Sequence, residues 1–200
     1  MPVLGERSPT PARCRRWSIV PLLVSSLILC SGPEASAAPA TEGTPEYDLK
    51  AVFLFQFAHF VTWPVRSFHD ANSPLTIGVL GTDPFGAVLD EIVANEAIGA
   101  RGLVVRRYQA VDQVDACHVL FISPSEANQL PSILAKLKGR TVLTVGDTKD
   151  FVARGGIVGF TVDRKRLRLR VNLAAADSAQ LTISSKLLRQ AEVVRGGAKR

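Results

Sequence analysis

The sequence contains little cysteine, and this excludes a disulfide-stabilised fold. Three cysteines occur in 200 residues, and Cys14 and Cys30 lie in an N-terminal segment with the features of an export signal. Only Cys117 remains once that segment is removed, and a single cysteine cannot close an intramolecular disulfide. We therefore expect a hydrophobic core to stabilise the fold. The apolar strand expected around Cys117 also argues against an intermolecular disulfide.

An uninterrupted apolar run long enough to cross a membrane is also absent. A spanning helix needs about 20 continuous apolar residues. The apolar stretch that begins at Trp17 is shorter, and a proline and two serines interrupt it. Arginines precede it and an Ala-Ser-Ala motif at residues 35–37 follows it, which is the order of a secretory signal. We predict that residues 1–37 are a cleaved signal peptide and that the protein acts outside the cytoplasm, without direct membrane insertion after cleavage.

Other interpretations of this segment stay open. Arg15 and Arg16 form a twin arginine, although the following Trp17 fits a Tat signal poorly. Residues 27–30 resemble a lipoprotein box, although Leu29 stands where a small residue should precede the cysteine. An uncleaved anchor is a third alternative, and the length of the stretch argues against it.

The rest of the chain has the length of one domain. Removing residues 1–37 takes away four arginines and two glutamates, so the net charge falls from +6 to +4. This mild positive charge is weak support for an anionic partner, and export argues against nucleic acid. Residues 38–46 are rich in Pro, Gly and Thr and are expected to be a flexible linker. We expect one α/β domain at residues 47–195 and a disordered tail at residues 196–200.

Short apolar strands alternate with helical segments along this domain. A helix from Tyr47 to Trp63, ended by Pro64, is apolar nearly all round and is expected to be buried on more than one side. The alternation predicts an α/β fold with three layers and a mostly parallel sheet, with an antiparallel hairpin near the C-terminus. The expected strands are residues 75–81, 103–107, 117–122, 141–145, 157–162 and 166–171; the expected helices are residues 83–94, 123–138, 173–179 and 184–194, with a short one capped by Asp147.

A glycine-containing loop joins the first strand to the following helix. Gly81, Asp83, Phe85 and Gly86 form a candidate ligand loop, because such loops lie at the carboxyl ends of parallel strands. The loop has no lysine, Pro84 removes one backbone amide, and Asp83 stands where a phosphate would lie. These features disfavour a nucleotide site and favour a tight turn followed by a helix cap.

The residues that carry catalysis or metal binding do not form a recognisable set. The histidines are His59, His69 and His118. They lack helical ligand spacing, and Cys117 and His118 point to opposite faces of one strand, so we expect neither a metal nor a cofactor. Ser123 and Ser125 belong to a capping box, Gly-x-Ser-x-Gly is absent, and no base is visible near either serine. We therefore predict no catalytic residues and no enzymatic activity.

A row of arginines is the most prominent candidate binding surface. Arg166, Arg168 and Arg170 alternate with apolar residues, so one face of the strand carries three guanidinium groups about 6.6 Å apart. On an edge strand such charges can simply block unwanted pairing. They can also bind carboxylates of a partner or of an anionic polymer. With Lys186 in the expected C-terminal helix, they form our candidate partner-binding surface.

Several segments, in this order, resemble the YfiR-like family, and the match covers roughly residues 47–194. The segments are residues 50–64 (KAVFLFQFAHFVTWP), 77–86 (IGVLGTDPFG), 117–123 (CHVLFIS), 171–176 (VNLAAA) and 183–188 (ISSKLL). The resemblance implies a periplasmic α/β domain with a Rossmann-like sheet, often a homodimer, without enzymatic activity. It also implies a partner: characterised members bind the periplasmic part of a membrane-anchored diguanylate cyclase, which lowers cyclic di-GMP synthesis and restrains biofilm formation.

This sequence departs from the family in its cysteines. The characterised relative has cysteine pairs that form disulfides, whereas the expected mature chain has only Cys117, which puts redox sensing in doubt. We expect a periplasmic regulatory binding protein that acts on a membrane-anchored signalling protein. The alternative is a periplasmic small-molecule-binding or sensing module with its pocket at the loop from Gly81 to Gly86.

Overall fold

The structure, a computed structural model of the chain, describes residues 44–194. The expected signal peptide, residues 38–43 of the expected linker and the expected tail lie outside these residues. The described residues belong to one unit of the chain. Within it, no helix is both long enough and apolar enough to cross a membrane.

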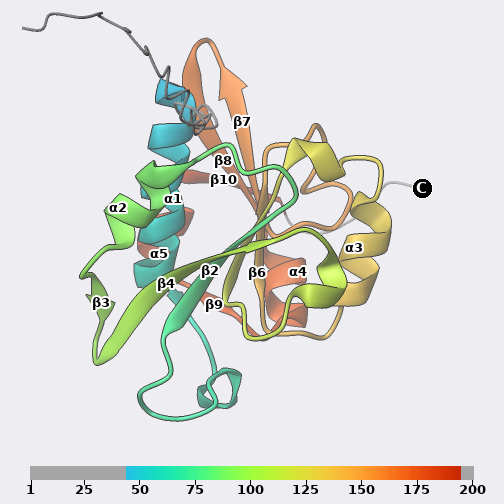
Figure 1. The fold of residues 1–200 in the computed structure, drawn as a ribbon. Helices are drawn as coiled ribbons and strands as arrows, with labels where there is room; N and C mark the ends of the chain where they lie inside the picture. Colours follow the sequence, from blue (N-terminus) through green and yellow to red (C-terminus); the bar gives the residue numbers. More distant parts are fainter. Residues whose placement is uncertain (1–43, 195–200) are drawn as a thin grey trace, which may run out of the picture. The chain divides into compact units, whose positions relative to one another are not determined.

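A central sheet organises the described domain (Figure 1). Its strands follow the order β10-β8-β7-β6-β5-β2-β4-β3. Most neighbouring pairs are parallel, and β7–β8 and β3–β4 are antiparallel. This confirms the predicted mostly parallel sheet and its C-terminal hairpin. The strands are β2 (Leu75–Leu80), β3 (Ala97–Ile98), β4 (Arg101–Tyr108), β5 (Val119–Ile122), β6 (Leu143–Gly146), β7 (Val158–Asp163), β8 (Arg166–Asn172) and β10 (Ala191–Val194).

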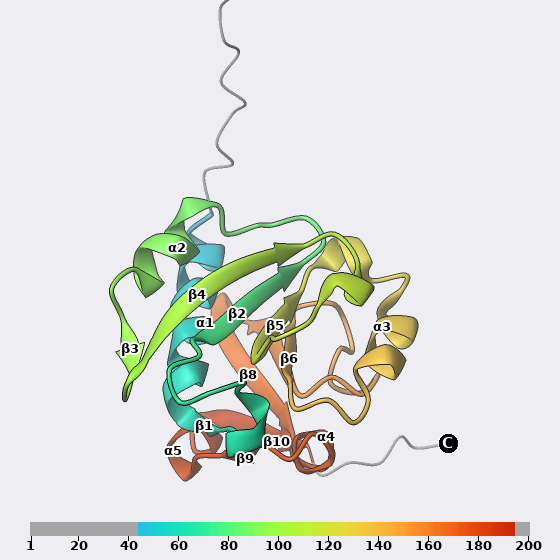
Figure 2. The ribbon, with the colours of Figure 1, turned by 60° about the horizontal axis from the view of Figure 1, so that its bottom comes forward.

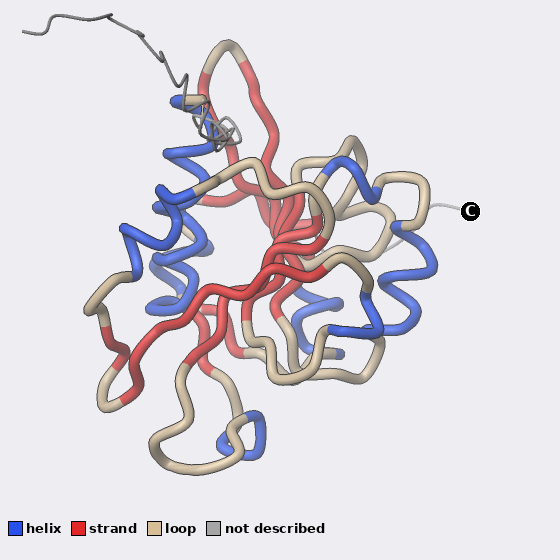
Figure 3. The backbone as a smooth tube through the Cα atoms, in the orientation of Figure 1, coloured by secondary structure: helices blue, strands red, loops and turns tan. Residues whose placement is uncertain are grey.

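Helices cover both faces of the sheet, which gives the three predicted layers (Figure 3). On one face lie α1 (Pro45–Phe60), α2 (Ala87–Val93) and α5 (Ser185–Leu188); on the other lie α3 (Leu130–Leu137) and α4 (Leu173–Ser178). A separate short pair, β1 (Val61–Thr62) with β9 (Thr182–Ile183), lies near α5 (Figure 2). Two clusters of buried apolar side chains form the core.

The first helix is buried against the sheet and α2 and exposed along its outer face. It begins at Pro45, two residues before the expected start, and its inward residues include Leu54 and Phe57, which are fully buried. Leu49 is 46% exposed and Val52 is 38% exposed. The helix packs against both the sheet and α2, which agrees with the expected burial on more than one side, and only its outer face is exposed.

The expected helix at residues 184–194 is wrong in its second half. Ser184 caps the short helix α5, and the chain then forms β10, which pairs with β8 from Ala191↔Leu169 to Val194↔Asn172. The two valines that end this segment favour an extended backbone, and the edge of β8 offers hydrogen-bonding partners.

At three other positions where the sequence predicts the start of a helix, the structure differs from the prediction. The residues after Asp83 form a turn, and α2 begins only at Ala87. Ser123 caps a short 3-10 turn (η3, Pro124–Glu126), and α3 begins at Leu130. Asp147 caps no helix, because its side chain contacts α1 instead. In each case the side chain of a short polar residue forms hydrogen bonds in a turn or with a distant partner. The local sequence does not distinguish such a residue from the cap of a helix.

Candidate functional site

The predicted ligand loop lies at the carboxyl end of β2 and is closed by the turn that follows β5. Gly81 has a positive φ of 88°, and a Cβ atom there would lie 2.7 Å from Glu126 Oε1. The backbone N–H of Thr82 donates to Ser125 Oγ at 3.0 Å. Ligands in this fold class bind at the carboxyl ends of the parallel strands, at the point where the strand order reverses, here between β2 and β5. The side chains of Ser125 and Glu126 pack against the loop at this place.

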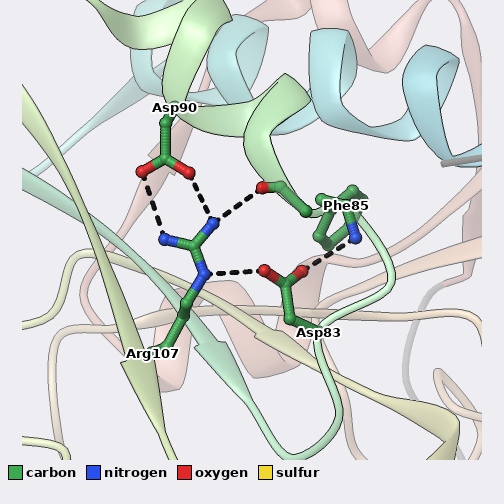
Figure 4. Close-up of polar contacts among 5 residues, drawn as sticks. Asp83, Phe85, Asp90 and Arg107 are labelled. Atoms are coloured by element: carbon green, nitrogen blue, oxygen red, sulfur yellow. Dashed lines mark hydrogen bonds and ion pairs between the residues drawn. The ribbon is translucent and has the colours of Figure 1, made fainter. Parts of the chain in front are cut away.

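The polar groups of the loop bind one arginine of β4 (Figure 4). Arg107 Nε lies 2.6 Å from Asp83 Oδ2, and Arg107 Nη2 lies 2.5 Å from Asp90 Oδ2 and donates to the carbonyl of Gly86 at 2.8 Å. The hydrogen bonds to Asp90 and then to Asp83 raise the pKa of Arg107. Asp83 Oδ1 accepts from the backbone N–H of Phe85 at 2.8 Å. Both carboxylate oxygens of Asp83 therefore have partners within the protein.

Phe85 of the same loop is a core residue. It is 1% exposed, and its ring lies edge-on to Phe121 and Tyr47, with centroids 4.8 Å and 5.6 Å away. The structure thus brings Gly81, Asp83, Phe85 and Gly86 together in a packed, internally bonded turn.

A buried ion pair lies beside this turn, and sequence reasoning missed it. Lys50 of α1 is 2% exposed, and its ammonium lies 2.6 Å from both Asp147 Oδ2 and Glu46 Oε1. The hydroxyl of Tyr47 donates to Asp147 Oδ2 at 3.0 Å, and the ammonium lies 4.1 Å from the centroid of the Tyr47 ring. Burial and the Asp147 charge raise the pKa of Tyr47. The signal in the sequence was a lysine in an otherwise apolar helix, because a buried ammonium needs an anionic partner.

A cavity of about 410 Å³ adjoins this ion pair at the carboxyl end of β6. Asp147 Oδ1 and Thr148 Oγ1 are buried and have no hydrogen-bond partner among the described residues. The cavity is lined by Glu46, Tyr47, Lys50, Pro124, Asp147, Thr148, Lys149, Phe160, Thr161 and Val162. It combines aromatic walls with charges of both signs.

The predicted arginine row lies on β8, with the predicted alternation. Arg166 and Arg168 are exposed, and Leu169 between the arginines is buried. The side chain of Arg170 is 32% exposed and lies 3.3 Å from Glu192 Oε1 of β10. Arg170 therefore contributes to strand pairing, whereas Arg166 and Arg168 face solvent.

A groove of about 430 Å³ runs beside Arg168, between β8 and the start of β10. Lys186 lies on α5 and is exposed, but it is not among the residues that line this groove. Arg189, at the end of α5, lines it instead. The prediction of a helix over residues 184–194 did not reveal that Arg189 lies beside the groove, because the position of Arg189 depends on the pairing of β10 with β8. The groove is lined by Thr161, Asp163, Arg168, Leu169, Arg189, Gln190, Ala191 and Glu192.

Cys117 and His118 are structural residues on opposite faces of the sheet. His118 Nδ1 accepts from the backbone N–H of Thr76 at 3.1 Å, and its ring stacks on Phe68 at 4.4 Å between centroids. Burial lowers the pKa of His118 and raises the pKa of the Cys117 thiol to about 12. Over residues 44–194, no group of three His, Cys, Asp or Glu side chains is placed to hold a metal ion.

These features define a three-layer α/β domain with a basic, strand-based surface. The chain belongs to the YfiR/HmsC-like family, whose model matches residues 47–192. Members of this family are regulatory domains of the periplasm rather than catalytic ones. A search of curated proteins gave no match.

A solved structure shares the fold. It is the crystal structure of a conserved domain protein from Vibrio cholerae O1 biovar eltor, with a TM-score of 0.51 and 14% sequence identity. The similarity covers 77% of this chain and 62% of that chain, so this chain spans less than two thirds of the other protein's length. At this identity the likeness shows the fold alone.

Proposed function

We propose that the protein is a periplasmic regulatory binding protein that contacts the periplasmic part of a membrane-anchored diguanylate cyclase and lowers cyclic di-GMP synthesis in the cytoplasm. The observation that carries the proposal is membership of the YfiR/HmsC-like family over nearly the whole described domain. In this proposal the protein acts by protein–protein contact and has no enzymatic activity, and cyclic di-GMP is the partner's product rather than a ligand of this domain.

Homodimer formation is a further part of this proposal. It is supported by the outer face of α1, where Leu49 is 46% exposed and Val52 is 38% exposed. Light scattering on the purified protein tests it: we expect twice the monomer mass, and a lower mass for Leu49→Asp with Val52→Asp. A monomer at all concentrations would remove the dimer from the proposal.

Deletion of the gene tests the regulatory function. We expect cyclic di-GMP and biofilm to rise in the deletion strain and to return to the original level when the exported protein is supplied. Cross-linking in intact cells should join the protein to a membrane protein with a diguanylate cyclase domain. Unchanged cyclic di-GMP on deletion, together with no cross-linked membrane partner, would contradict the proposal.

A small-molecule-binding module is the second candidate function, and the cavity beside Asp147 favours it. The buried Thr148 Oγ1 and Asp147 Oδ1 lack partners there, and unpaired buried polar atoms are unfavourable unless a ligand or water binds them. Thermal-shift screening with small polar compounds tests this. A stabilising compound should lose its effect in Thr148→Val and keep it in the control Lys138→Ala, at an exposed position of the chain that does not line this cavity. Compounds that stabilise neither protein would count against this function.

A further inference from the structure

The tip of the β7–β8 hairpin projects beyond its neighbouring strands (Figure 1). We call residues 161–168 the ribbon. β6 pairs with β7 only at Val158 and Gly159, and β10 pairs with β8 only from Leu169 onward. Along the ribbon, therefore, both strand edges are open within the described domain. Open edges present unpaired backbone groups that another strand can bind.

The register shows which backbone groups are free. The turn consists of Arg164 and Lys165, both with positive φ, and the flanking pair is Asp163↔Arg166. In a two-residue hairpin the flanking pair exchanges hydrogen bonds, and the next pair, Val162↔Leu167, does not. The N–H and C=O groups of Leu167 consequently point outward from the edge of β8.

The two faces of the ribbon differ in chemistry. Val162 is 58% exposed and Leu167 is half-buried on one face, whereas Arg166 and Arg168 are exposed on the other. Arg189 adds a second guanidinium to the groove beside Arg168. Successive side chains of a strand added at this edge would lie alternately on the apolar face and on the cationic face of the ribbon.

The positive charge of the ribbon favours an acidic segment at its open edge. Residues 163–168 contain four cationic residues and one acidic residue. None of the four cations forms an ion pair within residues 44–194. Pairing with the ribbon of a second copy would bring these like charges together, which is unfavourable. An acidic segment would instead gain charge-assisted hydrogen bonds from the arginines.

We propose that the free edge of β8 at residues 166–168, with the groove between Arg168 and Arg189, binds an extended segment of a partner protein in which acidic and apolar residues alternate. The segment adds to the sheet as a further strand. Its backbone pairs with Leu167, its carboxylates bind the two arginines, and its apolar side chains lie on the Val162 face. This inference deepens the proposed function and rests on it, because it assigns the surface that contacts the cyclase.

Charge reversal in cells tests the surface. In Arg168→Glu with Arg189→Glu, we expect cyclic di-GMP to rise to the level of the deletion strain. The matched control, Arg164→Glu with Lys165→Glu, makes the same charge change at the turn, outside the proposed edge and groove, and should raise cyclic di-GMP much less than the groove variant does. Normal repression by the groove variant would overturn the inference while leaving the proposed function intact. No effect of deletion itself would instead overturn the proposed function.

Proline substitution tests strand addition without a change of charge. Leu167→Pro removes an outward N–H on the β8 edge, and Val162→Pro removes the equivalent group on the β7 edge. Both variants must unfold at similar temperatures to be compared. We expect loss of repression only in Leu167→Pro; equal behaviour of two similarly stable variants would contradict addition at β8.

A peptide experiment tests the surface independently of the cyclase. The probe is a synthetic peptide of alternating Glu and Val with blocked ends, and the comparison peptide has the same residues as a Glu block and a Val block. We expect the alternating peptide to bind the purified protein, to protect the Leu167 amide from hydrogen exchange, and to bind at least ten-fold more weakly to Arg168→Glu with Arg189→Glu. Equal binding to both proteins, or no binding of the alternating peptide, would overturn the inference.

Discussion

Lys50 Nζ of α1 lies 2.6 Å from Asp147 Oδ2 at the end of β6, although 97 residues separate the two. The side chains are 3% and 8% exposed, so water screens the pair little. The pair fixes the start of α1 against the carboxyl edge of the sheet. It also sets one wall of the cavity beside Thr148.

Removal of the Asp147 carboxylate should destabilise the fold. We expect Asp147→Ala to lower the free energy of unfolding by about 3 kcal/mol, because a nearly buried ammonium loses a partner. Urea unfolding followed by circular dichroism measures this. Glu46→Gln is the control: Glu46 binds the same ammonium but is 49% exposed, so its loss should cost about 1 kcal/mol or less. Equal costs for the two variants would show that burial does not set the strength of the pair.

Stability should fall on mild acidification because of His118. Burial lowers its pKa in the folded state below the ordinary value of 6.5, so below about pH 6.5 the unfolded chain binds a proton that the folded chain does not. The free energy of unfolding is therefore lost as the pH falls below 6.5, by at most about 1.4 kcal/mol per pH unit. Unfolding at pH 7.5 and pH 5.5 measures this loss. It should be smaller in His118→Gln, and the same pH dependence in that variant would assign the effect to other groups.

The thiol of Cys117 should be unreactive in the folded protein. It is 5% exposed and its pKa is about 12, so only about one thiol in ten thousand is ionised at pH 8. We expect iodoacetamide to label Cys117 only after unfolding in urea, as mapped by mass spectrometry of its peptide. Rapid labelling without urea would show that this part of the sheet opens.

Arg107 should hold the loop at the end of β2. We expect Arg107→Ala to cost about 1–2 kcal/mol, because it removes charge-assisted bonds to Asp83 and Asp90 that are partly screened by solvent. Arg106→Ala, one residue away, removes an exposed contact to Asp115 at 3.4 Å and should cost about 0.5 kcal/mol or less. Hydrogen exchange should quicken at the Phe85 amide in the first variant alone. Equal exchange in both would show that Arg107 does not order the loop.

Much of the fold was predictable because its signals are local. Residues 157–162 and 166–171 are two strand-like segments joined only by a short link around residues 163–165, which predicts the β7–β8 hairpin directly. The opposite orientation of Cys117 and His118 follows from the alternation of side chains along a strand. The expectation for residues 184–194 failed because apolar spacing at Leu187, Leu188 and Ala191 fits a helix as well as it fits a short helix followed by a strand.

The candidate site was predictable only in part. The alternating arginines of β8 were visible in the sequence, but the separation of Arg170, which binds Glu192, from the free Arg168 depends on where β10 begins. Asp147 has the local pattern of a helix cap, and only the position of Lys50 gives it another partner. Helix-capping signals are short and polar, so they also occur where a side chain bonds across the fold.

The sequence by itself determined the α/β class, the order of most strands and helices along the chain, the antiparallel hairpin and the alternation of arginines on β8, because hydrophobic periodicity and turn residues act over a few neighbouring positions. The tertiary structure alone decided which strands lie side by side, that Asp147 meets Lys50, and that Arg189 lies beside the groove at Arg168. Such contacts join residues far apart in the chain or across a change of element. Their energy comes from burial and pairing that exist only once the sheet has formed.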